Sequence, residues 1–308
     1  MNKRQKEILQ NELKNEKTVL NQIKAVYQKA LSDMEAKIQK MQAKILLNPD
    51  DIAAVYQRQF QVALKKQVSA ILDNLNSEQY DKIQDYLELC YENGYIGVMY
   101  DLQVQGIPLI LPINQEQVVM AIQHDTKLKK PLYEALGYNV EQLKKTIAGE
   151  ISRGIANGYM YAEIARNIKK HCKVSANKAY TIARTEGHRI AEQSKADARQ
   201  KAKDAGAKIV KQWDATLDNR TRKSHQKIDG QIRELDEYFE VNGHKAQHPG
   251  GFGIAKEDIN CRCITLQRAK CALDEEELNT LKKRAEYFNL DKTKDFEEFK
   301  EKYLKSLN

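Results

Sequence analysis

Apolar residues in the first fifty positions recur at helical spacing. The segment from Lys3 to Leu47 contains no Gly or Pro. Apolar side chains return every seven residues, at Leu13, Leu20, Tyr27, Met34 and Met41. Their apolar neighbours shift along the segment, as they do when a straight helix drifts against a heptad. We therefore predict one long amphipathic helix that packs against other helices rather than a long autonomous coiled coil.

A break at Asn48–Asp51 separates this helix from the next. Pro49 cannot continue a helix, and an Asp after it can cap the N-terminus of a new one. The pattern predicts further helices near Asp51–Leu75, Ser77–Asn93, Gln115–His124 and Pro131–Leu136. Between them, the aromatic and apolar segment Gly94–Pro112 is expected to form buried packing and an extended connection.

The residue composition of the chain changes near Asn139. Small residues alternate with Ile at helical spacing over Val140–Gly158 and Tyr161–Ile168, which allows helices to approach closely. A long helix is predicted from about Ser175 to Ala205, with Gly206 as its C-terminal cap.

Two later segments have the composition of strands, Ala207–Ala215 and Cys261–Gln267. The fold class is therefore predicted as mainly α with a small α+β C-terminal domain. It comprises a long N-terminal helical arm, a helical middle and a short antiparallel sheet. The predicted regions are a helical region over 1–136, a domain over 137–270 and a helical C-terminal tail over 271–308, whose charged part begins at Asp274.

The charge balance is mildly basic. Lys and Arg number 51 against 43 Asp and Glu, which gives a net charge of +8 and a pI near 9.0. That balance suits work near nucleic acid without requiring it. The C-x-C spacing of two of the five cysteines is too tight for an ordinary mutual disulfide, which favours a reducing compartment. With no signal peptide or apolar run of membrane-spanning length, we expect a soluble protein.

The stretch between the predicted strands gathers the single tryptophan, three of the six histidines and two of the five cysteines. Zinc binds four N or S ligands in a tetrahedron, so the sequence predicts a possible structural zinc site. His225, Cys261 and Cys263 are the preferred ligands, completed by His248 or, as an alternative, His244. The competing interpretation is that the cysteines are small buried strand residues and the histidines are surface or hydrogen-bonding groups.

The same residues permit two catalytic hypotheses. His225 and Cys261 could form a Cys/His dyad. Alternatively, His225, Asp229 and His248 could hold a metal-activated water in a nuclease. Neither arrangement contains a specific motif, so no catalytic residue is predicted and the protein is not expected to be an enzyme.

One group of charged residues precedes this His/Cys stretch, and a second lies within it. In the string I-A-R-T-E-G-H-R-I, which contains Arg184, Glu186 and Arg189, the last two are spaced for a helical ion pair. A structural pair that fixes this helix against the strands is favoured over a nucleotide-transfer site.

Asp218 is placed to cap a helix that begins in N-R-T-R-K-S-H. Arg220, Arg222 and Lys223 follow it and could contact phosphate, because phosphate binding requires only positive charge and donors. They could equally form a solvated face.

Four motifs occur in a specific order: I-A-R-T-E, then W-D-A-T-x-D-x-R-T-R-x-x-H-x-x-I-D-G-Q, then H-P-G-G-F-G, then I-N-C-R-C. The combination resembles the head-morphogenesis or minor head protein family of tailed bacteriophages, the Mu-F-like group, over roughly Val140–Leu266. The residues that carry the resemblance are Arg184, Glu186, Trp213, Asp218, Arg220, Asp229, Gly230, Asn260 and Arg262.

The resemblance implies a low-copy minor capsid protein that associates with the portal at the DNA-packaging vertex during procapsid assembly. Capsid or scaffolding proteins and packaged double-stranded DNA would be its partners. It would reside in the virion, in the head interior or at the portal vertex, and in the host cytoplasm during assembly, without a membrane role.

Many relatives carry C-P-x-C where this chain has Arg222 and His225, so one ligand of any shared metal site is lost and another changes to imidazole. The alternative that the resemblance leaves open is an enzyme or toxin-related module built on the His/Cys cluster.

Overall fold

The computed structural model describes residues 1–47, 54–123, 132–157, 159–216, 218–270, 289–290 and 292–306. As predicted, the protein is mainly α-helical with a small antiparallel β region. It forms two compact units, each assembled from separate stretches of chain. Unit 1 comprises Met1–Lys17, Asp85–Lys129 and Arg184–Asn308, and unit 2 comprises Thr18–Gln84 and Lys130–Ala183. The predicted division into three consecutive regions stays a prediction.

The first two helices are long. Helix α1 spans Lys3–Leu47, as the apolar periodicity predicts, and α2 spans Ala54–Val104. The prediction of a helix boundary near Asn76 is wrong, because the side chain of Asn76 accepts a hydrogen bond from Gln79 one turn later, within the helix. The prediction that Gly94 begins a connection is also wrong. A Cβ at Gly94 would lie 2.7 Å from the Ala191 carbonyl oxygen, so this glycine lets α2 approach the next long helix of unit 1 closely.

Three more helices follow: α3 over Gln115–Gln123, α4 over Leu132–Ala156 and α5 over Tyr161–Asp204. The short helix predicted near Pro131–Leu136 is thus only the beginning of α4. The proposed helix break at Asn48–Asp51, His124 and most of the tail after Asp274 lie outside the described residues. None of the helices in the described part of the chain combines the length and apolar character that crossing a membrane requires.

Helix α5 ends at the predicted glycine. Gly206 has a φ of 95°, and the Ala207 N–H donates to the Ala202 carbonyl while the Gly206 N–H donates to Lys203. This pair of bonds is the Schellman arrangement, in which a residue with positive φ closes the last turn. The chain then reverses into the β region.

The remaining elements are short. They are β1 (Ile209–Asp214), α6 (Lys223–Gln226), β2 (Ile232–Arg233), β3 (Phe239–Val241), β4 (His244–Ala246), α7 (Ala255–Asp258), β5 (Ile264–Ala269) and α9 (Phe296–Ser306). One antiparallel sheet has the order β2-β1-β5, and β3 with β4 forms a separate hairpin.

The sheet pairs strands that are distant in sequence. β1 and β5 pair along their whole length, from Ile209 opposite Ala269 to Asp214 opposite Ile264. The strand predicted over Cys261–Gln267 therefore begins three residues later than expected. Its first residues instead follow a turn in which Asn260 has a φ of 54°, a conformation that Asn tolerates better than most residues.

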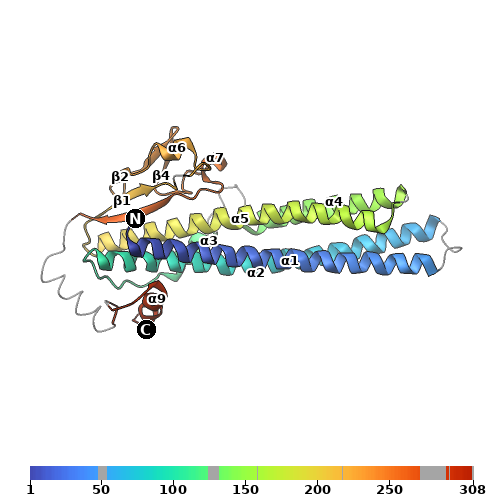
Figure 1. The fold of residues 1–308 in the computed structure, drawn as a ribbon, viewed down its shortest axis with the longest axis horizontal. Helices are drawn as coiled ribbons and strands as arrows, with labels where there is room; N and C mark the ends of the chain where they lie inside the picture. Colours follow the sequence, from blue (N-terminus) through green and yellow to red (C-terminus); the bar gives the residue numbers. More distant parts are fainter. Residues whose placement is uncertain are drawn as a thin grey trace. The chain divides into compact units, whose positions relative to one another are not determined.

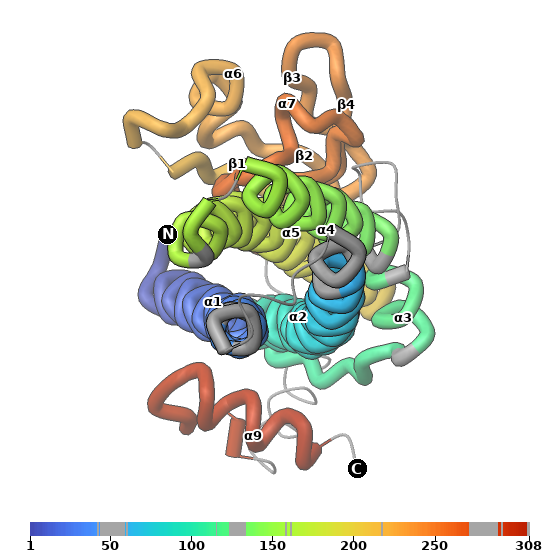
Figure 2. The backbone as a smooth tube through the Cα atoms, turned by 90° about the vertical axis from the view of Figure 1, so that its right-hand side faces the viewer, coloured from blue at the N-terminus to red at the C-terminus, as the bar shows by residue number. Residues whose placement is uncertain are grey.

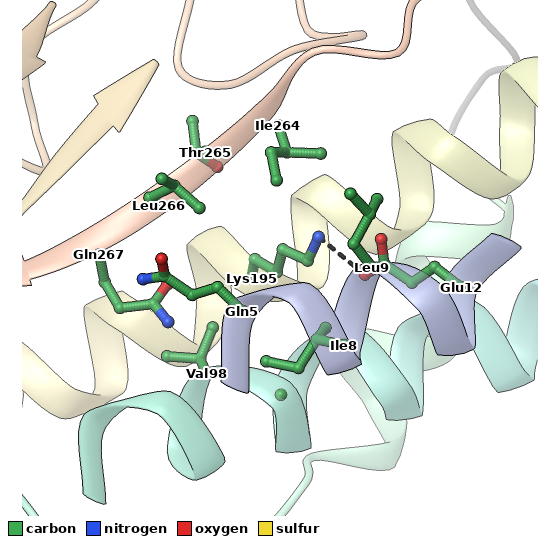
Figure 3. A pocket seen from close by; sticks show the side chains of 11 residues that line it. Gln5, Ile8, Leu9, Glu12, Val98, Lys195, Ile264, Thr265, Leu266 and Gln267 are labelled. Carbon is green, nitrogen blue, oxygen red and sulfur yellow. Dashed lines mark ion pairs between the residues drawn. The ribbon is translucent and has the colours of Figure 1, made fainter. Parts of the chain in front are cut away.

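Within unit 1, β5 lies beside the second half of α5 (Figure 1). A buried charged network joins the two elements. The Glu192 carboxylate accepts hydrogen bonds from the Thr265 N–H at 2.9 Å and the Thr265 hydroxyl at 2.6 Å. Lys195 lies 2.9 Å from Glu192 and 2.7 Å from Glu12 of α1, and Arg199 donates to the Thr265 hydroxyl at 2.8 Å. Figure 3 shows Lys195 and Glu12 beside a cavity of about 20 Å³, which has room for one water molecule.

A second buried carboxylate, that of Asp101 on α2, gathers four amide groups. Asn2 donates to it at 2.6 Å, Gln5 at 2.8 Å, Gln105 at 2.9 Å and Gln267 at 2.5 Å. Because these donors come from the start of α1, the end of α2 and β5, the Asp101 carboxylate ties three segments of unit 1 together.

Unit 2 consists of helical segments of α1, α2, α4 and α5, seen along their axes in Figure 2. One buried hydrogen-bonded cluster takes a residue from each helix. The Tyr27 hydroxyl contacts Gln79 at 3.2 Å and Ser175 at 3.1 Å, and the Asn139 amide donates to the Ser175 carbonyl at 3.0 Å. Burial raises the pKa of Tyr27 to about 12, so the hydroxyl stays protonated.

Candidate metal centre

His225, Cys261 and Cys263 lie together in the core of the β region. The His225 Nδ1 atom is 3.4 Å from the Cys263 sulfur and 3.6 Å from the Cys261 sulfur. All three side chains are buried, and their ligand atoms lie within 4.8 Å of one another. In a tetrahedral zinc site with Zn–N near 2.0–2.1 Å and Zn–S near 2.3 Å, N and S ligands are about 3.6 Å apart. Both the donor types and their spacing therefore fit zinc.

The backbone around the two cysteines is held from α5. The Asn260 N–H donates to the Thr185 hydroxyl of α5 at 3.2 Å. Before that turn, the Asp258 carboxylate accepts the N–H groups of Phe252, Gly253 and Ile254, at 3.0, 2.7 and 3.2 Å. These bonds fix the H-P-G-G-F-G loop and the I-N-C-R-C turn against each other.

Aromatic packing positions the histidine. The Trp213 ring meets the His225 ring edge-on, with centroids 5.5 Å apart and planes at 89°. Trp213 is completely buried and also packs against Phe239 at 5.1 Å. The turn that carries His225 returns to β1 through Gly230, whose φ is 76° and whose N–H donates to the Trp213 carbonyl at 2.9 Å.

Glu257 orients the imidazole of His225, a role that the sequence pattern did not reveal. Its carboxylate lies 3.0 Å from His225 Nε2 and also accepts hydrogen bonds from Ser224 and Asn242. Burial alone would raise the pKa of Glu257, but these bonds and the histidine lower it, so the group is ionised. A carboxylate only accepts, so Nε2 carries the proton and Nδ1 presents its lone pair to the sulfurs, the usual arrangement behind metal-binding histidines.

His188 of α5 is the second residue that sequence reasoning missed. Although burial lowers its pKa, hydrogen bonding to Cys261 and the charge of that thiol raise it. The His188 Nε2 atom is buried without a hydrogen-bond partner. The signal was present in the sequence, because His188 lies three residues after Thr185 and so shares its helix face.

The two thiols behave as a coupled pair. Hydrogen bonding from Cys263 lowers the pKa of Cys261, with further contributions from His188 and His225. The same bond raises the pKa of Cys263. A lowered pKa favours the thiolate of Cys261, which is the form that binds metal.

The other predicted ligands lie elsewhere. The ring nitrogens of His248 contact the Pro249 carbonyl oxygen at 2.9 Å and Gln193 at 3.1 Å, and His244 is exposed on β4. The Asp229 carboxylate accepts the Ala215 N–H at 2.8 Å. Among the described residues, the structure therefore groups His225 with the cysteines and does not bring together the three residues of the nuclease hypothesis.

The predicted N-cap is wrong. α6 begins after Arg222 without any side-chain cap. The Asp218 carboxylate accepts the Arg220 N–H two residues later at 3.0 Å, a local turn bond that competes with capping. Asp218 also forms a two-point pair with Arg262, both distances being 2.7 Å.

The three cations of this turn differ in their surroundings. The Arg222 guanidinium donates to the Ile259 carbonyl at 2.6 Å. Arg220 is largely exposed, 3.8 Å from Asp218, and Lys223 is exposed. Only the latter two present their charge freely to a phosphate.

The ion pair predicted on α5 is confirmed, with Arg189 Nε 2.8 Å from Glu186. Arg189 also donates to the Ala121 carbonyl at 3.0 Å, so the pair fixes α5 to α3 instead of to the strands. Arg184 reaches Glu16 of α1 at 2.8 Å. The charged string thus connects helices of unit 1.

Comparisons with known proteins agree with the motifs. The family model described as Phage Mu protein F like protein matches residues 145–266. Minor head protein GP7 of Bacillus phage SPP1 is 31% identical over 209 residues, which are 66% of this chain and 67% of that protein. No solved structure matches the chain significantly.

A second relative is a named enzyme. NAD(+)--arginine ADP-ribosyltransferase EFV of Enterococcus faecalis is 34% identical over 269 residues, or 87% of this chain. The chain spans only about half of that relative, 55% of its length. An uncharacterized protein of Haemophilus influenzae is 29% identical over 122 residues, 39% of this chain and 24% of its own. The motif order, the family match and the similarity to a minor head protein together show that this chain belongs to the phage minor head protein family.

Proposed function

We propose that the protein is a minor head protein of the virion that associates with the portal vertex during procapsid assembly, alongside capsid or scaffolding proteins. The observation that carries this proposal is the similarity to the SPP1 minor head protein over two thirds of both chains. The motif residues support a structural role. Trp213 is core, Arg262 pairs with Asp218, and the Asn260 backbone binds Thr185.

The helices of unit 2 offer the surface that would meet the portal. Three apolar side chains of unit 2 are exposed: Val62 of α2 by 60%, Val174 of α5 by 51%, and Met160, just before α5, by 70%. Exposed apolar side chains contribute to association when a partner removes them from water.

Co-expression with the portal protein tests this role. The wild-type protein should co-purify with portal rings or procapsids, and the Val62→Asp and Val174→Asp variants should be recovered in reduced amount. Ile232→Asp is the matched control, since Ile232 is an exposed apolar residue of unit 1. Equal loss in the control, or no portal association of the wild type, would contradict the proposal.

Direct contact with packaged double-stranded DNA is proposed for Arg220, Arg222 and Lys223. Arg220 and Lys223 supply free charge, whereas Arg222 chiefly holds the Ile259 carbonyl. Each phosphate contact contributes about 0.9 to the slope of log affinity against log salt. The double variant Arg220→Ala/Lys223→Ala should therefore lower this slope by roughly 2 in duplex-binding titrations. An unchanged slope would remove these residues from the DNA interface.

The proposed role needs no catalytic step. The cluster residues His225 and Cys261 are buried, which denies a substrate access to a Cys/His dyad. The second candidate is arginine ADP-ribosylation, favoured by the similarity to the Enterococcus faecalis transferase. Incubation of the purified chain with labelled NAD⁺ and an arginine-rich protein distinguishes the two. Transfer of label would establish the enzyme, and its absence alongside portal association supports the structural role.

A further inference from the structure

We propose that His188, His225, Cys261 and Cys263 form a structural zinc site that clamps α5 to the turn before β5. The proposal is independent of the portal and DNA roles, since it concerns how unit 1 is held together. His188 replaces both His248 and His244 as the fourth ligand.

Three of the donors already stand at tetrahedral spacing. The two N···S separations, 3.4 and 3.6 Å, are close to the value of about 3.6 Å that zinc imposes. Two imidazole and two thiolate donors suit zinc, while Mg²⁺ and Ca²⁺ prefer oxygen ligands.

The fourth donor must approach from the side of α5. His188 interacts with the Cys261 thiol, and its Nε2 atom is buried without a partner. An unpartnered buried polar atom normally costs free energy, so this second imidazole, which lies beside Cys261 and has an open ring nitrogen, is suited to bind a ligand. His248, by contrast, uses its ring nitrogens on Gln193 and Pro249.

The surroundings are those of a metal site. Glu257 holds His225 by Nε2 and leaves Nδ1 facing the sulfurs. The buried Trp213 indole N–H has no nitrogen or oxygen acceptor. It points to the Cys263 sulfur, which the Thr216 N–H also approaches. Thiolates bound to a metal accept such N–H groups, and these outer contacts tune the site.

Zinc here would act as a cross-link. His188 lies on α5, His225 on α6 and the cysteines directly before β5. One ion would thus join three segments whose other connections include the Thr185–Asn260 hydrogen bond and the packing around Trp213. Metal binding of this kind contributes directly to folding free energy.

The test uses the full-length chain purified without added chelator. Elemental analysis should find one zinc per chain, and exchange with Co²⁺ should give the visible bands of tetrahedral coordination together with sulfur-to-cobalt charge transfer. Wild-type protein that binds neither Zn²⁺ nor Co²⁺ would overturn the site. Stoichiometric iron or copper in place of zinc would overturn the assignment of the metal.

Ligand variants identify the fourth donor. His188→Gln and Cys263→Ser should weaken Zn²⁺ affinity by more than the roughly 10–100-fold that loss of an outer partner costs, and Glu257→Gln should fall within that range. His248→Gln and His244→Gln are the matched controls and should retain wild-type affinity. Loss of zinc in His248→Gln but not in His188→Gln would overturn the proposed ligand set.

A rescue variant guards against misfolding. If His188→Gln fails to fold, His188→Cys restores a donor at the same place and should bind Co²⁺ with stronger charge-transfer bands, because a third thiolate joins the set. A folded His188→Cys protein with an unchanged cobalt spectrum would contradict ligation at this position.

Discussion

Two buried polar clusters lie at opposite ends of the segment from Cys261 to Thr265. They differ in whether their polar atoms find hydrogen-bond partners within the protein. In the charged network around Thr265, Glu192 meets Lys195 and Arg199 donates to the threonine hydroxyl. In the His/Cys cluster, His188 Nε2 and the Trp213 N–H remain buried without partners. The first cluster is satisfied by the protein itself. The second leaves two buried polar atoms without protein partners, which is the basis of the proposed zinc site.

The largest expected effect comes from opening the complete network. Glu192→Gln removes the buried anion that Lys195 and Thr265 share and should destabilise the protein by about 3–5 kcal/mol, since removing one partner of a buried ion pair is strongly destabilising. Urea denaturation measures this loss. Glu163→Gln, an exposed position on the same helix, should be neutral, and an equal effect at both positions would contradict the network's role.

The same carboxylate predicts a pH dependence. Burial alone would raise the pKa of Glu192, but Lys195, other nearby cations and Thr265 lower it to about 2, from an ordinary value of 4.5. In that window the unfolded chain binds the extra proton, so the stabilisation is fully present above about pH 4.5 and is lost as pH falls towards 2. The stability difference between wild type and Glu192→Gln should therefore shrink as the pH is lowered from about 4.5 towards about 2. A constant difference would refute the assigned ionisation.

Filling the incomplete cluster gives an intermediate effect. Zn²⁺ at 100 times its dissociation constant should stabilise wild-type protein by about 2.7 kcal/mol, and a chelator should reverse this in thermal unfolding. Cys263→Ser should show no such response. Glu192→Gln should keep it, because the charged network does not contribute a ligand.

The smallest effect is expected at the Asp101 carboxylate. Asp101→Asn replaces the shared acceptor by an amide that faces four amide donors. The free energy of unfolding should fall by about 1–3 kcal/mol, as measured by urea denaturation. Asp81→Asn, at an exposed site, serves as the control. A stability equal to that of wild type would show that the amide side chains reorient freely.

The sequence predicts elements whose own periodicity decides them. The apolar stripe of α1 and the strand before Asp214 depend on local pattern, and both occur close to where they were expected. The local pattern could not predict that α2 continues through Gly94. This glycine allows close contact with Ala191, a residue far along the chain, and that contact is visible only in the folded structure.

The candidate site shows the same limit. His225, Cys261 and Cys263 could be grouped from composition alone, and the structure brings them together. The sequence offers His248 or His244 to complete the set, yet the His248 ring contacts Gln193 of α5 instead. His188 lies in a long helix outside the His/Cys stretch, so the sequence pattern does not group it with the cysteines, and only tertiary packing brings it to Cys261.

The Asp101 carboxylate also has a consequence for the timing of biosynthesis. Its bond to Gln267 spans 166 residues, and ribosomes add about 5–20 residues per second. A nascent chain therefore waits roughly 8–33 s after Asp101 is made before Gln267 exists to complete the set of donors. The donor set of Asp101 is therefore completed late in translation, after most of unit 1 has been made.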